Sequence, residues 1–188
     1  MTKLETTPIG TLSGFVALET PSFKFDEDGI YSCKMLFEGK NAVAMKEKID
    51  SHIEDANIKN KSKLSFPYEI DENEKLIVRF KQKGKKTSIN GEVYEYNIKF
   101  FNSKAEEITT PLDMGEGSKI KIAYTPYVWN SPGFGVGCTM QPVMVQVIEL
   151  VKFSRDDNPF DTVADGFIGE DNSNAVFLDN KEDDDIQF

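Results

Sequence analysis

The sequence has 188 residues and a net charge of −10, with 22 Lys and Arg against 32 Asp and Glu. This length suits one well-cored domain with an appendage and is short for two independent cores. An acidic chain would argue against nucleic acid as a partner, but the charge is unevenly spread. Residues 1–153 carry 20 basic and 21 acidic side chains, and residues 154–188 carry 2 and 11. The first segment is therefore nearly neutral and can still present a basic face.

The chemistry-bearing residue types are too few for catalysis. There is one histidine, His52, and no cluster of metal ligands or nucleophile–base pair, so we expect neither an enzyme, nor a metal, nor a cofactor. Cys33 and Cys138 lie far apart in apolar alternating stretches, which predicts buried thiols in a reducing compartment. With no signal-like apolar segment and no apolar run of membrane-spanning length, we expect a cytoplasmic protein with no membrane partner.

The first third of the chain predicts two strands and a helix. Residues 9–19 alternate loosely and indicate a strand with a bend near Gly14, ended by Pro21. Residues 26–29 end in Asp-Gly, which is typical of a tight hairpin turn. The next stretch, 30–37, has a period of two and predicts a half-buried strand whose core face holds Tyr31, Cys33, Met35 and Phe37.

Helical spacing follows in residues 41–56, with Asn41 as the expected N-cap. The apolar face of this helix consists of Ala42, Met45, Ile49, Ile53 and Ala56. His52 lies beside that face and is interpreted as structural. Residues 57–74 are polar and lack a sustained period, so they are expected to form a connecting loop.

A basic strand is predicted in residues 75–86, because apolar and cationic side chains alternate there. Leu76, Val78 and Phe80 would face the core, and the opposite face would carry Arg79, Lys81, Lys83 and Lys85. A second strand is expected over residues 92–101. A third, 119–129, repeats the basic pattern, with Ile120, Ile122 and Tyr124 on one side and Lys119, Lys121, Tyr127 and Trp129 on the other.

The body closes on a glycine-rich stretch and a long strand. Residues 130–137 are followed by no helix, so they do not predict a phosphate-binding loop. Residues 138–153 predict a strand interrupted at Pro142, with one face made of Val143, Val145, Val147 and Val151. Beyond this strand no period is visible. We therefore predict an OB-fold domain at 1–153 and a disordered acidic tail at 154–188.

Five or more strands with one helix between the second and third fit a five-stranded OB barrel, and a β-sandwich is the competing architecture. A single strand of nucleic acid exposes phosphates and flat bases, so a sequence-tolerant binder needs cations and stacking rings. The predicted binding residues are Arg79, Lys81, Lys83, Lys85, Lys119, Lys121, Tyr127 and Trp129. The alternative is a solvated lysine face with Tyr127 and Trp129 sealing one end of the barrel.

Three stretches resemble the replication single-stranded DNA-binding proteins of short-tailed bacteriophages. They are residues 117–121 (GSKIK), 126–130 (PYVWN) and 143–150 (VMVQVIEL). The resemblance implies an OB fold, sequence-independent binding of single-stranded DNA, strand annealing in replication, recombination and repair, and a homodimer. It also implies that the acidic tail contacts the replicative DNA polymerase and the primase-helicase. Tyr127 matches an aromatic residue of that family, whereas Lys81 stands where a second stacking ring would be sought.

The sequence ends on an acidic run with apolar side chains at its tip, and the predicted protein-interaction residues are Asp183, Asp184, Asp185, Ile186 and Phe188. Charged residues would guide the approach of a partner and Phe188 would fill a pocket. The tip resembles that of bacterial single-stranded DNA-binding proteins, with Gln187 in place of their proline. We expect the tail and DNA to compete for the basic face. A protein adaptor and an RNA-binding module are the alternatives.

Overall fold

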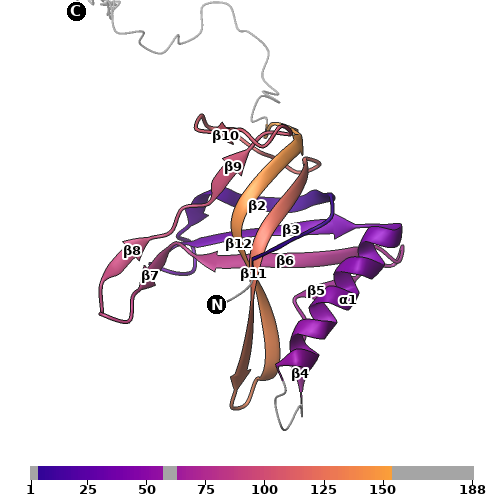
Figure 1. Ribbon diagram of the computed structural model, residues 1–188, viewed down its shortest axis with the longest axis vertical. Coiled ribbons are helices and arrows are strands. Elements are labelled where there is room, and N and C mark those ends of the chain that lie inside the picture. Colours follow the sequence, from indigo (N-terminus) through magenta and orange to yellow (C-terminus); the bar gives the residue numbers. More distant parts are fainter. Residues whose placement is uncertain (1–3, 57–62, 154–188) are drawn as a thin grey trace, which may run out of the picture. The chain divides into compact units, whose positions relative to one another are not determined.

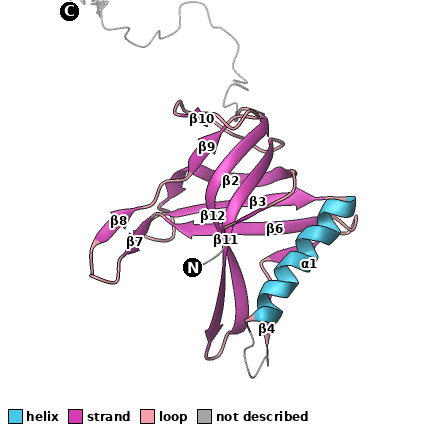
Figure 2. Ribbon diagram, in the orientation of Figure 1, coloured by secondary structure: helices cyan, strands magenta, loops and turns pink. Residues whose placement is uncertain are grey.

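The computed structural model describes residues 4–56 and 63–153, and the predicted tail lies outside them (Figure 1). The described part consists mostly of β-strands with a single α-helix (Figure 2). In this part of the chain no helix is long and apolar enough to cross a membrane.

Five strands form a closed ring. Its members are β2 (Gly10–Ser22), β3 (Ile30–Phe37), β6 (Leu76–Lys83), β12 (Gly135–Glu149) and β11 (Lys119–Ser131). They are hydrogen-bonded in the order β2-β3-β6-β12-β11, and β11 returns to β2 through Lys119↔Thr11 and Ile120↔Gly10. This is the Greek-key ring of an OB fold, which confirms the predicted fold class and excludes the two separate sheets of a sandwich.

The ring closes at a seam between β6 and β12, where the strands are parallel and one register pair, Met140↔Phe80, joins them. Two short strands flank this pair. β5 (Tyr68–Ile70) lies antiparallel to β6, and β4 (Leu64–Ser65) lies parallel to β12. The prediction of an unbroken loop over 57–74 is therefore wrong for these residues, although 57–62 lie outside the described part.

Strand β2 bends as predicted. Gly14 has a φ of 68°, and the register against β3 shifts between Ser13 and Ala17. The strand does not end at Pro21 but runs on to Ser22. Pro21 is tolerated because it lies within a second register shift, between Ala17 and Ser22, where it has no register partner on β3.

The helix α1 (Gly39–Asp55) lies between β3 and β6 in the chain, as predicted, and packs against β3, β11 and β12 (Figure 1). Its buried residues are Ala42, Met45, Ile49 and Ile53, whereas Ala56 is exposed. Asn41 is not the N-cap. Glu38 occupies that position without a side-chain cap, and the Asn41 amide donates to the carbonyl of Ile9 at 3.3 Å.

The strand predicted over 92–101 is in fact two. β8 (Val93–Glu95) pairs with β7 (Lys85–Thr87) in a hairpin that projects from the barrel, and β9 (Lys99–Phe101) joins β12 and β10 (Glu107–Ile108) (Figure 1). The break marks a change of partner: the Tyr96 N–H still donates to the Gly84 carbonyl at 2.6 Å, in register with the hairpin, and β9 then pairs with β12 instead of β7.

The core confirms the predicted alternation of β3, β6 and β11. Fully buried aromatic and aliphatic side chains from the ring meet those of α1; the largest are Tyr124, Phe37, Phe80, Leu12, Leu18, Met35, Met45 and Ile49. Cys33 and Cys138 are both free and buried, as expected. The last strand differs from the prediction. It ends at Glu149, and Val151 is exposed.

Candidate nucleic-acid interface

The outward face of β6 is cationic. Val78, Phe80 and Gln82 are buried, so the alternating residues between and beyond them, Arg79, Lys81 and Lys83, point to solvent. All three belong to the predicted binding set. Lys85 lies past Gly84 on β7, in the projecting hairpin, and so is not part of this face.

The strand register brings the cationic face of β6 close to the predicted stacking residues of β11, which lie across the seam. Phe80 and Met140 are an inward pair at the seam, and Thr139, the outward residue of β12 next to Met140, lies close to this point. Thr139 in turn pairs with Tyr127 of β11. Two strand spacings separate Tyr127 from β6, about 10 Å. We call Arg79, Lys81, Thr139, Tyr127 and Trp129 the seam face.

Trp129 lies flat on its neighbouring strand. It pairs with Gly137, where an added Cβ would lie 2.7 Å from the ring atoms Cε2 and Cη2 and closer still to Cζ2. The indole N–H donates to the Thr139 hydroxyl at 3.2 Å. Trp129 is half-buried and Tyr127 is 55% exposed. One face of the indole is thus fixed against the strand, which pre-organises the ring for stacking on its other face.

Several predicted cations are neutralised by nearby carboxylates. Glu69 contacts both Arg79 at 3.1 Å and Lys34 at 3.4 Å, and these cations hold the pKa of Glu69 below its usual value. Lys83 contacts Asp28 at 3.1 Å and Asp26 at 3.5 Å. Among the described residues of β6, Lys81 is the cation without an ion pair. It therefore contributes to the seam face a positive charge that no ion pair neutralises.

Lys119 and Lys121 are not brought to the seam face. They lie at the opposite end of β11, six to eight positions before Tyr127, which is about 20 Å or more along a strand. Lys119 is also paired with Glu149 at 2.8 Å. The single basic and aromatic stripe expected on β11 is therefore two separate regions.

An aromatic loop, which the sequence reasoning missed, borders the seam face. Residues 23–29 join β2 to β3, the first two strands of the barrel, and we call them the L12 loop. The ion pairs of Lys83 hold this loop against β6. Phe25 is 85% exposed, and the Lys24 ammonium lies 5.3 Å from its ring centroid. Phe23 is also exposed, and its ring lies against Gly29. The available signal was the Phe-Lys-Phe sequence beside a turn.

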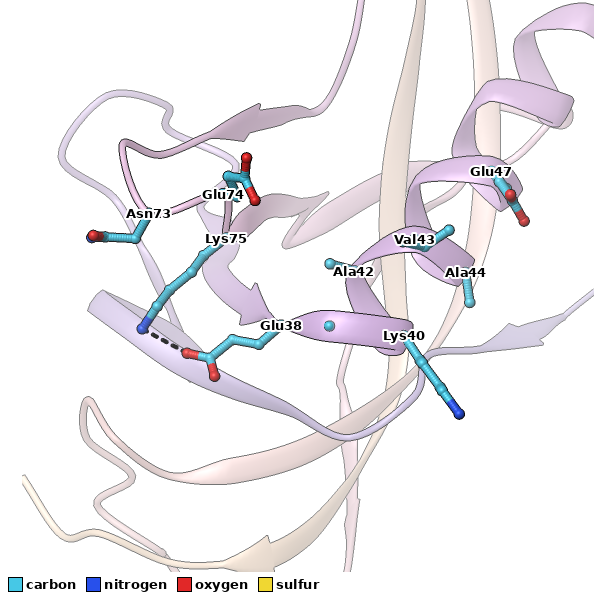
Figure 3. Close-up of a pocket in the computed structure, with 10 residues that line it drawn as sticks. Glu38, Lys40, Ala42, Val43, Ala44, Glu47, Asn73, Glu74 and Lys75 are labelled. Carbon is cyan, nitrogen blue, oxygen red and sulfur yellow. Dashed lines mark ion pairs between the residues drawn. The ribbon is translucent and has the colours of Figure 1, made fainter.

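A different hollow, of about 700 Å³, lies at the start of α1 (Figure 3). Its lining includes Glu38, Glu47 and Glu74 against Lys40 and Lys75. Figure 3 shows Lys75 reaching Glu38, at 2.6 Å, while Lys40 points away. A surplus of carboxylates does not suit a polyanion, so we assign this hollow no part in nucleic-acid binding.

The protein-interaction residues of 183–188 lie outside the described residues. Within 4–56 and 63–153, no group of three or more His, Cys, Asp or Glu side chains is placed to hold a metal ion. The histidine does have a structural neighbour, because His52 Nε2 lies 3.4 Å from the Glu5 carboxylate.

Comparison with solved structures finds a similar fold in phage proteins. The crystal structure of gp2.5, a single-stranded DNA-binding protein encoded by bacteriophage T7, matches with a TM-score of 0.70 and 18% identity, covering 89% of this chain and 99% of that one. The chain has the fold of phage single-stranded DNA-binding proteins. A second match, the single-stranded DNA-binding protein of bacteriophage Enc34 in complex with single-stranded DNA, has a TM-score of 0.58 and 14% identity, covering 78% and 86%. No protein-family model matches the sequence, nor does any curated protein.

Proposed function

We propose that this protein binds single-stranded DNA without sequence preference, along the seam face and the L12 loop. The observation that carries the proposal is the juxtaposition of an unpaired cation, Lys81, with the exposed ring of Tyr127 and the half-buried ring of Trp129 on an OB barrel. OB folds bind oligonucleotides across the face of their second and third strands, between the loops that correspond here to L12 and the β11–β12 hairpin. These two strands are β3 and β6.

Each part of the site supplies one component of the affinity. Lys81 attracts phosphates and releases counterions, so binding weakens as salt rises. Tyr127, Trp129 and Phe25 each offer a ring face to a base, and a stacked base contributes about 1 to 3 kcal/mol. Stacking does not depend on base identity, which explains tolerance of sequence.

The fluorescence of Trp129, the single tryptophan, tests the proposal directly. We expect a homopolymeric oligonucleotide to quench the emission at low salt and the quenching to be lost at high salt. Duplex DNA and RNA of the same sequence are the competitors that define the ligand. No quenching, together with no binding of a labelled oligonucleotide, would refute the proposal, and stronger displacement by RNA would reassign the site to RNA.

We further propose that residues 1–153 are the DNA-binding domain and residues 154–188 a protein-interaction segment. The charge of this segment, −9, is what supports competition with DNA for the cations. Deleting residues 179–188 is expected to tighten DNA binding at low salt and to abolish partner binding. Phe188→Ala, which keeps the charge, is the matched control and should lose partners only. Unchanged DNA affinity after the deletion would exclude the competition.

The expected partners are a replicative DNA polymerase and a primase-helicase, with roles in strand protection, annealing and recombination, in a cytoplasmic homodimer. Asp183, Asp184 and Asp185 would supply the charge, and Ile186 and Phe188 the apolar contact, in partner binding. Pull-down of each candidate partner by the full chain and by the truncated chain tests this assignment. Sedimentation equilibrium tests the dimer.

A further inference from the structure

A pocket of about 310 Å³ lies beside the L12 loop and is not used by the stacking residues of the seam face. Its walls come from β2, the L12 loop, Tyr31 of β3, the β7–β8 hairpin and the two residues that follow β8. We call it the hairpin pocket; the lining residues that matter here are Phe23, Tyr31, Lys85, Glu95, Tyr96 and Asn97. This volume is at the lower end of the range for ligand sites, which suits a small planar group.

The aromatic walls of the hairpin pocket are held in place. Tyr31 is buried, and its ring meets Tyr96 edge to face, with centroids 6.4 Å apart and planes at 65°. The Tyr96 hydroxyl donates to the Pro142 carbonyl at 3.2 Å. Phe23 lies across the loop on Gly29. Because Tyr31 is almost fully buried, a flat ring that enters would meet the rings of Phe23 and Tyr96, which are already held in place.

Two polar side chains of the hairpin pocket remain available. Glu95 and Asn97 are exposed and make no side-chain hydrogen bond or ion pair with the other described residues. By contrast, Glu19 accepts the Leu112 and Asp113 N–H groups, at 3.0 and 3.1 Å. The Glu95 carboxylate adds to burial in raising the pKa of the Tyr31 phenol, so its charge lies close to the aromatic wall.

Charge decides which part of a nucleotide can enter. Glu19, Asp28 and Glu95 give the pocket more carboxylates than cations, which disfavours a phosphate inside it. Lys85 lines the same pocket without an ion pair to another described residue, and Lys81 lies on the adjoining strand β6. A bound strand would keep its phosphates on these lysines and turn a base inward.

We propose that the hairpin pocket takes one unstacked base of the bound strand and, at that one position, favours cytosine over thymine. The inference rests on the proposed function and adds a single base preference to the otherwise sequence-tolerant stacking on the seam face. Cytosine presents an amino group where thymine presents the O4 carbonyl, and carboxylates accept from that amino group. Glu95 would accept this hydrogen bond, and Asn97 can donate or accept toward the rest of the base edge.

The test measures dissociation constants of oligo(dC) and oligo(dT) of equal length, by fluorescence anisotropy, for the full chain and for Glu95→Gln. Removing a negative charge tightens binding to both, so the measured quantity is the dC-to-dT ratio of affinities. We expect this preference to fall at least about threefold in Glu95→Gln. Glu92→Gln, in the same hairpin but outside the pocket, should leave the ratio unchanged.

A second variant fills the pocket. Asn97→Trp is expected to weaken binding to both oligonucleotides at least about fivefold, whereas Val93→Trp, which is exposed and outside the pocket, is not. The pocket assignment is overturned, and DNA binding is left intact, if Glu95→Gln keeps the dC-to-dT ratio of affinities and Asn97→Trp keeps the affinity for both oligonucleotides. If the wild-type chain binds neither oligonucleotide, the proposed function fails and the inference falls with it.

Discussion

Replacing Gly137 by alanine should weaken DNA binding although Gly137 is buried beneath a ring and has no surface to offer a ligand. The new Cβ would lie 2.7 Å from two ring atoms of Trp129, and ordinary contact begins at 3.4 Å, so the indole must lift off its strand. The hydrogen bond to Thr139 is then lost or stretched. If one base stacks on this ring, the cost is about 1 to 3 kcal/mol, or about 5- to 150-fold in Kd.

The assay pairs anisotropy of a labelled oligonucleotide with the emission spectrum of Trp129. We expect a red-shifted emission, as the ring becomes more exposed, together with the loss of affinity. Gly133→Ala is the control, because its Cβ would meet nothing within 4 Å while its φ of 85° imposes strain on the same hairpin. If the emission shifts in Gly137→Ala but the affinity does not change, Trp129 does not stack on DNA and the seam face is wrongly assigned.

The ion pairs and the thiols give further predictions. Lys81→Ala should reduce the salt slope of DNA binding by about 1, more than Lys83→Ala does, since Lys83 is already paired; equal slopes would contradict this. Glu69→Gln should tighten binding at low salt by freeing two cations. In the folded wild type, the ion pairs lower the pKa of Glu69. Glu69 therefore adds to the free energy of unfolding at pH values above its unfolded pKa, and this contribution is lost as pH falls through the folded pKa. An acid titration of unfolding checks this. Cys33 and Cys138 should not react with a thiol reagent at pH 8 until the protein unfolds, because burial raises both pKa values, that of Cys138 to about 11.

The ring itself could be predicted because its strands alternate. In β3 and β6 each buried residue is followed by an outward one, so the period of two reports the core directly. β4 and β5 were missed for the opposite reason. They are edge strands that pair through the backbone, and most of their side chains are exposed, so no alternation marks them. The break between β8 and β9 depends on their different partners, β7 for one and β12 for the other, which no local pattern reveals.

The candidate site was predicted in kind but not in arrangement. Residue types correctly placed Lys81 and Tyr127 on outward faces, yet the separation of Lys121 from them depends on how far along β11 each residue lies. Ion pairing could not be read at all, because Glu69 is ten residues from Arg79 and belongs to a strand that was not predicted. Phe25 escaped notice because an exposed ring in a loop has no period.

The seam between β6 and β12 implies that a bound oligonucleotide also stabilises the barrel. One register pair joins β6 to β12, so amides on either side of it should exchange with solvent earlier than those elsewhere in the ring. The cations of the seam face lie on β6, on one side of this junction, and the aromatic rings lie on β11, on the other side. An oligonucleotide that contacts both the cations and the rings would hold β6 and β12 together. Hydrogen exchange at β6 and β12 should slow on binding, and the melting temperature should rise with ligand concentration.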